Sequence, residues 1–573
     1  MRTFTVYDER RRVIPTVNAK IFLKDPLVAT QPGGVGIETV KIDGEACLGT
    51  GPTSSRVVIV DYNGELDTLF DGATLNSKGS AFNLGRKKDP VENFHFHQVH
   101  VWAVIHKTLE LLEASDVLGR QIPWAFPGGR LLVLPHAGYW ENAYYDRSTG
   151  GLHFFYFEGV TTGKPVYTCL SHDIVAHELG HAVLDGLKPY YNEVTSAQTA
   201  GFHEYFGDAI ALTAALNHRR IAVQVAGVGT GDLSTNNMIS NIAAEFGHGL
   251  ETEYGSLADS YLRNANNSWT MSDLAGEQEE HELSKVPTGA YYDLLREVYE
   301  QLIAKKNRKK GNDRVASLMT AAGVTRRMML RALDYCPPID LQYDDYAQAV
   351  IRADRVAFPI DSSGYRAIAV AIFTKRELAA ELDAPDQELA IRNDQLRGLD
   401  IDILAASITD AYRFLDRNRA VFDIPEVANF NVINLYRTKK TSANDYRVPQ
   451  EIVIEFVWQE EIKLTSTDFG PLRGTFFPIW CGGTVVFSRE GNLLHYVLKR
   501  NTKGRRDELK KYVSSLIEKG YLSLDTGERG IGATSGRGAK IVASMHDGRV
   551  RLSRNSAMRH FHFDGGTEGH HHG

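Results

Sequence analysis

The sequence is poor in cysteine. Its 573 residues include only four, Cys47, Cys169, Cys336 and Cys481, and long stretches of chain separate them. Such wide spacing argues against a disulfide framework and is typical of a protein in a reducing compartment. We therefore expect the cysteines to be buried as small apolar side chains rather than to bind a metal.

Long apolar runs and an excess of one charge are also missing. No stretch approaches the roughly 18 apolar residues of a membrane-spanning helix, and residues 1–10 lack the apolar centre of a secretory signal. Lysine and arginine number 64 against 71 for aspartate and glutamate, so the formal net charge is −7, with both signs mixed. We expect no membrane span, no nucleic-acid partner and, by default, a cytoplasmic protein, with export by another route left open.

The most informative motif is HExxH at residues 177–181. Residues four apart lie on the same face of a helix, so His177 and His181 can bind one metal ion together. Glu178 lies beside them, where it can accept a proton. Ser171 is a plausible N-cap, and apolar residues recur after it at helical spacing. The segment therefore predicts an amphipathic helix that carries a zinc site of the metalloprotease kind.

A second segment, around Glu204 and Asp208, supplies what this site still needs. A catalytic zinc site has three protein ligands and one open position, and Glu204 would be the third ligand. Asp208 lies four residues later, on the same helical face, where it can accept the outer N–H of a ligand histidine. Apolar neighbours argue against a solvated helix face, because a buried pair of acids needs a partner.

The pattern resembles the thermolysin-like family of zinc metallopeptidases, the gluzincins, over roughly residues 90–380. The family places an HExxH helix before a helix that carries Glu and, four residues on, Asp, as in Glu204 and Asp208. The resemblance implies one Zn²⁺ per chain, bound by His177, His181 and Glu204. It also implies that Glu178 acts as the general base.

The resemblance implies further catalytic residues. His281 falls where the family has a second histidine that stabilises the transition state, and Tyr190 or Tyr191 falls near its oxyanion-stabilising tyrosine. In the family an Asp five residues before the histidine orients its ring, but Gly276 occupies that position here. Four acids could replace it, with Glu277 ranked first as the nearest to the family position: Asp273, Glu277, Glu279 and Glu280.

An alternative for His281 stays open. In it, His281 begins a helix and only packs, and Glu282 is the polar residue of interest.

Substrate-binding residues are also implied by the resemblance. Asn142 and Ala143 belong to a segment similar to the edge strand that holds the substrate backbone, and Arg263 is similar to an arginine that binds a substrate carbonyl. Ile174 and Leu262 are candidates for an apolar pocket, which would favour bulky apolar residues after the scissile bond.

Other metal sites receive less support. Calcium is not expected at the family's usual paired site, because Asp173 matches one ligand but Ala215 stands where a glutamate is needed. Four nearby histidines could bind a second metal, but such residues more often pack or face water, and the resemblance gives their helix a structural role: His95, His97, His100 and His106.

The expected fold class is α+β, with a thermolysin-like two-lobed architecture. A β-rich N-terminal segment covers residues 1–90, and a lobe with the HExxH helix covers residues 91–250. The helical lobe of the peptidase covers residues 251–380, with helices from about residue 288. An additional α+β domain of unknown role covers residues 381–573.

The sequence therefore predicts a zinc-dependent endopeptidase whose partner is a peptide or protein substrate. Two alternatives remain. A zinc aminopeptidase would use the same pair of helices but would need acids to hold a free α-amine. A non-catalytic zinc-binding interaction protein would have no need of Glu178 beside the metal. The sequence does not predict an oligomeric state.

Overall fold

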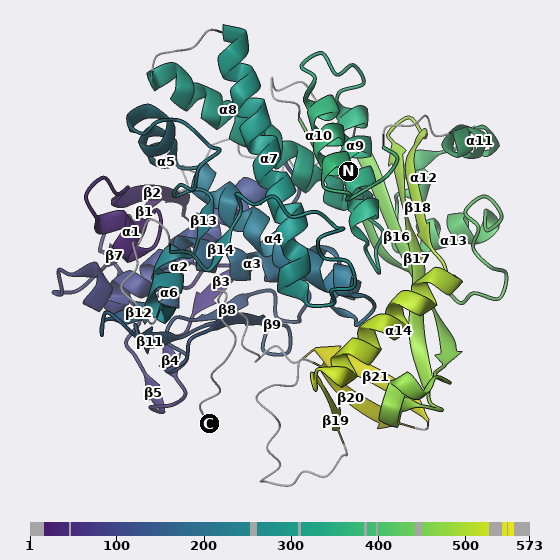
Figure 1. The fold of residues 1–573 in the computed structure, drawn as a ribbon, viewed down its shortest axis with the longest axis horizontal. Helices are drawn as coiled ribbons and strands as arrows, with labels where there is room; N and C mark the ends of the chain where they lie inside the picture. The colour runs from purple at the N-terminus through teal and green to yellow at the C-terminus, as the bar shows by residue number, and fades with distance from the viewer. Residues whose placement is uncertain are drawn as a thin grey trace, which may run out of the picture.

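The computed structural model describes residues 16–44, 47–251, 260–306, 311–382, 387–396, 399–441, 450–525, 541–546 and 548–554. It combines long helices with several small sheets and one larger sheet (Figure 1). The expected α+β class is confirmed. Among the described helices, none is both long enough and apolar enough to cross a membrane.

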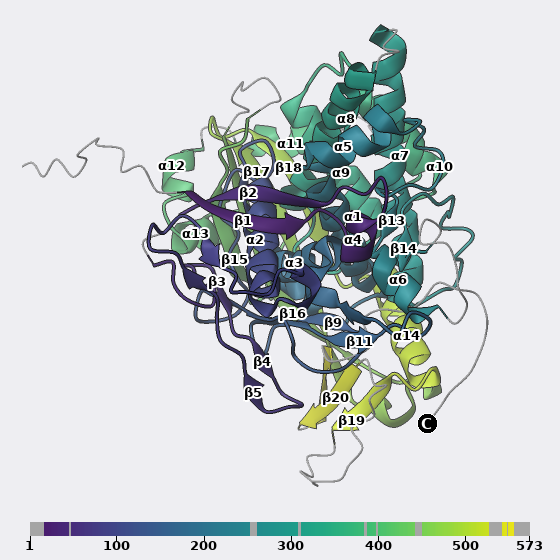
Figure 2. The same cartoon turned by 90° about the vertical axis from the view of Figure 1, so that its left-hand side faces the viewer.

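The N-terminal region is rich in short strands, as expected. A four-stranded sheet has the order β3 (Val57–Ile59), β8 (Leu131–Leu134), β10 (Gly151–Phe154), β9 (Ala143–Asp146), so β9 forms one edge. A separate hairpin of β1 (Thr16–Phe22) and β2 (Ile37–Asp43) packs on helix α2 (Phe94–Glu113) (Figure 2). Two- and three-residue strands complete the region: β4 (Tyr62–Asn63), β5 (Thr68–Leu69), β6 (Thr74–Leu75), β7 (Phe82–Asn83), β11 (Tyr156–Glu158) and β12 (Pro165–Tyr167).

Helices α3 (His172–Leu187) and α4 (Ala197–Leu216) lie at the centre of the molecule (Figure 1). The Ser171 hydroxyl accepts a hydrogen bond from the N–H of Ile174, so the expected N-cap of α3 is confirmed. The two helices approach closely at a pair of glycines, because a Cβ on Gly180 would lie only 2.9 Å from the Cα of Gly207. This close crossing lets side chains from both helices meet at one point.

The next region is mainly helical. Its first helices are short: α5 (Arg219–Ala222) and α6 (Ala244–Leu250), with strands β13 (Asn241–Ile242) and β14 (Arg263–Asn264). Four longer helices follow: α7 (Glu280–Lys306), α8 (Gly311–Arg331), α9 (Tyr343–Ala357) and α10 (Tyr365–Lys375). Helix α7 begins at Glu280, earlier than the expected start near residue 288, so His281 lies in its first turn.

The C-terminal region holds a seven-stranded sheet with several helices, consistent with the α+β character expected there. Its order is β15 (Asn431–Arg437), β16 (Glu451–Lys463), β17 (Phe476–Ser488), β21 (Arg549–Arg554), β20 (Ile541–His546), β19 (Leu522–Asp525), and β18 (Leu493–Lys499) also pairs with β17. The accompanying helices are α11 (Gln387–Gln395), α12 (Ile401–Leu404), α13 (Ile408–Arg417) and α14 (Lys503–Glu518).

This sheet joins the C-terminal region to the rest of the molecule. On β16, Val453 belongs to the core that also contains α3 and α4, whereas Ile452 and Ile454 belong to a second core with α13. Alternating side chains point to opposite faces of a strand, so β16 is covered on both sides. The main hydrophobic core therefore continues across residue 381, the expected domain boundary.

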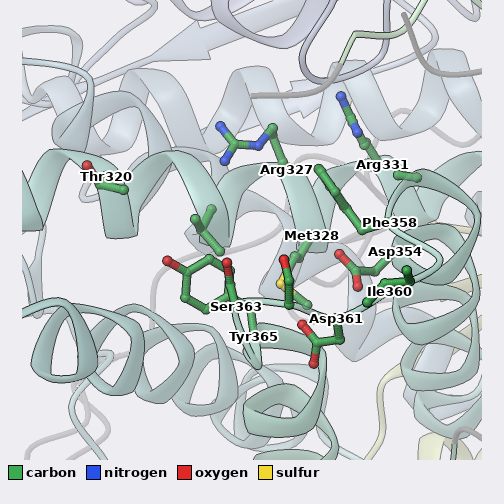
Figure 3. A pocket seen from close by; sticks show the side chains of 13 residues that line it. Thr320, Arg327, Met328, Arg331, Asp354, Phe358, Ile360, Asp361, Ser363 and Tyr365 are labelled. Carbon is green, nitrogen blue, oxygen red and sulfur yellow. The ribbon is translucent and has the colours of Figure 1, made fainter. Parts of the chain in front are cut away.

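One cavity, of about 360 Å³, lies between α8, α9 and the segment that leads into α10 (Figure 3). Arg327, Arg331 and Asp354 are among its charged lining residues. None of the residues predicted to bind metal or substrate lines this cavity.

Candidate metal centre

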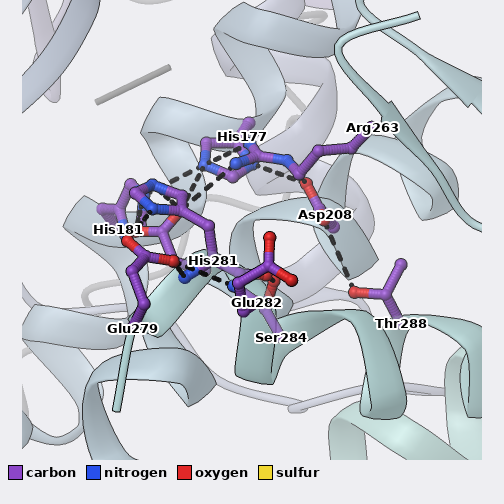
Figure 4. Close-up of polar contacts among 10 residues, drawn as sticks. His177, His181, Asp208, Arg263, Glu279, His281, Glu282, Ser284 and Thr288 are labelled. Carbon is purple, nitrogen blue, oxygen red and sulfur yellow. Dashed lines mark hydrogen bonds and ion pairs between the residues drawn. The ribbon is translucent and has the colours of Figure 1, made fainter. Parts of the chain in front are cut away.

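The three predicted metal ligands lie together at the crossing of α3 and α4. Figure 4 shows the two histidines among them. His177 and His181 come from one face of α3, and Glu204 comes from α4. All three side chains are buried, and their ligand atoms lie within 4.8 Å of one another.

The spacing of these donor atoms suits a tetrahedral ion. His177 Nε2 lies 3.1 Å from His181 Nε2 and 3.6 Å from Glu204 Oε2, and His181 Nε2 lies 3.8 Å from Glu204 Oε1. Zinc–nitrogen and zinc–oxygen bonds of about 2.0–2.1 Å in tetrahedral geometry place two ligand atoms roughly 3.3 Å apart. The residues present therefore fit a zinc ion with only small adjustments.

Asp208 lies where the sequence places it, beside a ligand histidine. Its Oδ1 is 3.0 Å from His177 Nδ1, which leaves Nε2 of the same ring for a metal. Thr288 donates to the other oxygen of Asp208 at 3.4 Å. The contact between Asp208 and His177 Nδ1 fixes the orientation of the His177 ring.

Arg263 belongs to the same cluster, and its guanidinium contacts the predicted ligands Glu204 and His177 as well as Asp208. Its Nε is 3.0 Å from Asp208 Oδ1, and its Nη1 is 3.4 Å from Glu204 Oε2. Its Nη2 is 3.1 Å from His177 Nδ1 and 3.2 Å from His177 Nε2, so the guanidinium faces the metal ligands and its role at a substrate carbonyl stays a prediction.

Glu178 is fully buried next to the cluster. Burial, with a further contribution from the charge of Glu204, raises the pKa of Glu178 to about 7, although the backbone N–H of Tyr145 on edge strand β9 and the His177 and Arg263 side chains oppose this rise. A carboxylate with a pKa near the working pH is suited to accept and return a proton.

His281 points to the ligand set from the first turn of α7. Its Nε2 is 3.4 Å from Glu204 Oε2, and its Nδ1 is 2.8 Å from Glu279 Oε1 (Figure 4). Burial disfavours the charged ring, but the carboxylates of Glu204 and Glu279 raise the pKa of His281 to about 9. His281 therefore lies at the start of a helix, and its ring also faces the predicted metal ligands. Glu282, the residue of interest in the alternative, forms an ion pair with Lys285.

The prediction that Glu277 orients the His281 ring is wrong. Its Oε1 accepts the backbone N–H groups of Gln278 and Glu279 and forms an ion pair with Lys519. Glu279 orients the ring instead. Its second oxygen also accepts the N–H of His281 and of Glu282, so one carboxylate caps the helix and fixes the histidine.

The side chains of Tyr190 and Tyr191 contact residues other than the predicted metal ligands. Tyr191 is fully buried and donates its hydroxyl to the Pro337 carbonyl at 2.6 Å, so this hydroxyl is already used. The half-buried Tyr190 packs against the ring of Trp480, with ring centroids 4.8 Å apart.

Tyr343, which the sequence did not indicate, is a tyrosine that packs on α4 one turn before the predicted ligand Glu204. Its hydroxyl lies so close to Gly201 on α4 that a Cβ there would overlap it. Burial and the charge of Glu204 raise the pKa of Tyr343 well above its usual value. The residue opens α9, far along the chain from α4, and no local motif marks it.

The residues predicted to bind substrate are divided between an edge and the core. Ala143 begins β9, and within the described residues no strand pairs with the outer side of β9. Asn142 precedes it and is buried. Ile174 and Leu262 are each 1% exposed, so both pack in the core.

The cavity beside Arg263, of about 170 Å³, has a largely polar lining. Its residues include Asp208, Asn236, Asn264, Asn266, Asn267, Trp269, Lys285 and Thr288.

Asp173, the residue that matches a calcium ligand of the family, is ion-paired with Lys24. Both side chains are almost completely buried, and Lys24 also donates to the Asn241 carbonyl at 3.2 Å. The ammonium group thus provides the positive charge beside Asp173. The absence of calcium stays a prediction.

No model of a known protein family matches this chain, and no curated protein is found to be similar to it. Function is therefore inferred from the geometry of the site.

Proposed function

We propose that this chain is a zinc-dependent endopeptidase with a thermolysin-like two-lobed architecture. One observation carries the proposal: the Nε2 atoms of His177 and His181 lie 3.1 Å apart, and each lies within 3.8 Å of a carboxylate oxygen of Glu204, close to the spacing around a tetrahedral ion. The neighbouring Glu178 distinguishes the arrangement from a purely structural site, since a structural metal has no use for a buried base.

When bound, zinc supplies Lewis acidity, which lowers the pKa of water and polarises a carbonyl group. Glu178 then accepts the proton of the attacking water on its carboxylate and delivers it to the leaving amine. His281 Nε2, held through Nδ1 by Glu279, donates a hydrogen bond to the oxyanion. The Tyr343 hydroxyl is the second candidate donor.

The edge strand supports a peptide substrate. An extended peptide can add to the free side of β9 through main-chain hydrogen bonds, without regard to its side chains. The backbone of Tyr145 on this strand lowers the pKa of Glu178, so the strand lies near the proposed base. The proposal keeps a preference for bulky apolar residues after the scissile bond. The cavity beside Arg263 has a polar lining and would favour polar residues instead. The positions at which peptides are cut therefore test this preference.

The test uses the zinc-loaded full chain and a library of N-terminally blocked peptides, with products identified by mass. The parent protein should cut within the peptides. Glu178→Gln should retain zinc and fold but lose at least ~10²-fold in turnover, the low end of what a positioned base contributes. His181→Ala should lose the zinc.

Three results would contradict the proposal in different ways. Cleavage only of peptides with a free amino terminus would identify an aminopeptidase. Full zinc content without any cleavage would identify a non-catalytic binding protein. Equal turnover by Glu178→Gln and the parent would remove the base from the mechanism.

A further inference from the structure

A second group of buried side chains could hold a metal ion. His97 belongs to α2, His136 follows strand β8, and Cys169 belongs to the 3₁₀ turn Thr168–Leu170, which precedes α3. All three are completely buried, and their ligand atoms lie within 4.8 Å of one another. None of them belongs to the proposed zinc site.

The outer nitrogens of both rings face hydrogen-bond acceptors. His136 Nδ1 is 2.7 Å from Asp61 Oδ1, and His97 Nε2 is 3.1 Å and 3.0 Å from the carbonyl oxygens of Pro90 and Val91. A carboxylate or a carbonyl oxygen can only accept here, so each ring carries its hydrogen on that outer nitrogen. The second nitrogen of each neutral ring is then a lone pair.

These two lone pairs face each other. His97 Nδ1 lies 2.8 Å from His136 Nε2, which is a favourable contact only if something positive lies between the nitrogens. The same arrangement occurs at the proposed zinc site, where the Nε2 atoms of His177 and His181 are 3.1 Å apart. A shared proton or a metal ion would satisfy the pair.

The surroundings favour a metal over a proton. A proton would leave a charged imidazole among aromatic rings, with Phe94 stacked on His136 at 4.2 Å and Tyr167 at 4.7 Å from His97. The Asp61 carboxylate would pair with that charge, but the sulfur of Cys169 would then take no part in the contact. A metal ion uses both lone pairs and the sulfur, and the Asp61–His136 contact is the carboxylate–histidine pair that orients metal ligands.

We propose that His97, His136 and Cys169 bind a second transition-metal ion, one that prefers imidazole and thiolate ligands, such as zinc or copper. Each ligand belongs to a different segment, so the ion cross-links α2, the chain after β8 and the turn that leads into α3. Its place is structural, because all three ligands are completely buried and a substrate therefore has no access to the ion.

The test measures metal content in the full chain by elemental analysis, which also distinguishes zinc from copper. The parent should contain about two ions per chain, His181→Ala about one, Cys169→Ala about one, and the double variant none. Cys336→Ala is the matched control, because the Cys336 sulfur is also buried but contacts the Ala332 carbonyl and is not part of this group, and the variant should retain both ions.

A second measurement keeps the test decisive if Cys169→Ala fails to fold. Cobalt-loaded His181→Ala should show a thiolate-to-metal charge-transfer absorption, which the His177–His181–Glu204 site cannot give. Absence of that absorption, or a His181→Ala protein that binds no ion, would overturn the proposal and identify a shared proton. Loss of one ion in Cys169→Ala but none in His181→Ala would support this site and contradict the proposed function.

Discussion

The orientation of His281 depends on a single carboxylate. Glu279 contacts the ring at 2.8 Å, whereas Glu277 contacts backbone N–H groups and Lys519. A hydrogen bond that strengthens only in the transition state raises kcat without changing ground-state binding. The two glutamates, two residues apart, therefore allow a matched comparison.

We expect Glu279→Gln to lower kcat and kcat/KM together, by roughly ten-fold or more, with KM and zinc content nearly unchanged. The Gln oxygen can still accept the helix N–H groups, so the fold should survive. Steady-state kinetics on a blocked peptide would measure the effect. Glu277→Gln should behave like the parent, and the opposite ranking of the two variants would return the orienting role to Glu277.

Glu245 makes stability depend on pH. Burial and the nearby charge of Asp25 raise the pKa of Glu245 to about 8, while its Oε2 accepts the N–H of Leu27 at 2.8 Å. The folded-state pKa lies above the unfolded value of about 4.3. Protonation therefore favours the folded state, and this stabilisation is lost as pH rises from about 4.3 towards 8.

Glu245→Gln should remove this loss, because Gln resembles the protonated acid and keeps an acceptor for Leu27. The difference in Tm between variant and parent should grow in favour of the variant from pH 5 to pH 8. Thermal melts at several pH values would measure it. Glu508→Gln, at an exposed position, should show no such trend, and a constant difference for Glu245→Gln would contradict the raised pKa.

At the scale of elements, the crossing of α3 and α4 depends on glycine. A Cβ on Gly207 would lie 2.6 Å from two atoms of the His177 ring, and a Cβ on Gly180 would approach the backbone of α4. The two glycines therefore allow α3 and α4 to approach closely enough for His177 to lie near Glu204. A helical glycine normally costs stability relative to alanine, so its presence here has a packing reason.

Gly207→Ala should displace the His177 ring and weaken zinc binding by roughly 10–100-fold, with a loss of about 1–3 kcal/mol in unfolding free energy. Zinc titration and denaturant unfolding would measure the two effects. Gly323→Ala on α8 is the control, since its Cβ would meet only the mobile end of Arg327 at 3.2 Å. It should leave zinc binding unchanged, and unchanged binding in Gly207→Ala would refute the explanation.

At the scale of the whole molecule, a buried ion pair connects the HExxH helix to the C-terminal sheet. Lys188, directly after α3, pairs with Glu455 on β16 and donates to the Cys336 carbonyl at 2.9 Å. Asn434 donates to the other oxygen of Glu455 at 2.7 Å. The charges are isolated from water, so each depends on its partner.

Glu455→Ala should reduce the free energy of unfolding by about 3–5 kcal/mol, because it leaves Lys188 buried and unpaired. Replacing both, as Lys188→Met with Glu455→Leu, should recover much of that loss. Asp468→Ala, which breaks the exposed pair with Lys510, should cost at most about 1 kcal/mol. Urea unfolding compares the three, and a small effect of Glu455→Ala would indicate that the C-terminal region folds independently.

The sequence determined the local part of the candidate site. Helical periodicity and the cap at Ser171 predicted α3, and the four-residue spacing placed His177 and His181 on one face. The same rule placed Glu204 and Asp208 on one face of α4. These predictions succeed because interactions within a few turns of chain decide them.

Tertiary structure alone decided every choice between distant residues. Packing selected Glu279 over Glu277, placed Tyr343 against Gly201 of α4, and placed Lys24 beside Asp173. It also separated the neighbouring histidines of α2. Each histidine has a different partner: His97 contacts His136, His100 accepts the N–H of Phe22, and His106 contacts Ser54.

The physical reason is that such contacts depend on how helices and strands cross, and sequence spacing does not encode those crossings. Hydrophobic periodicity shows which face of an element is buried, but not which partner covers it. The continuous core across residue 381 is the largest example. β16 is apolar on both faces, and only the packed molecule shows that one face covers the core of the proposed peptidase.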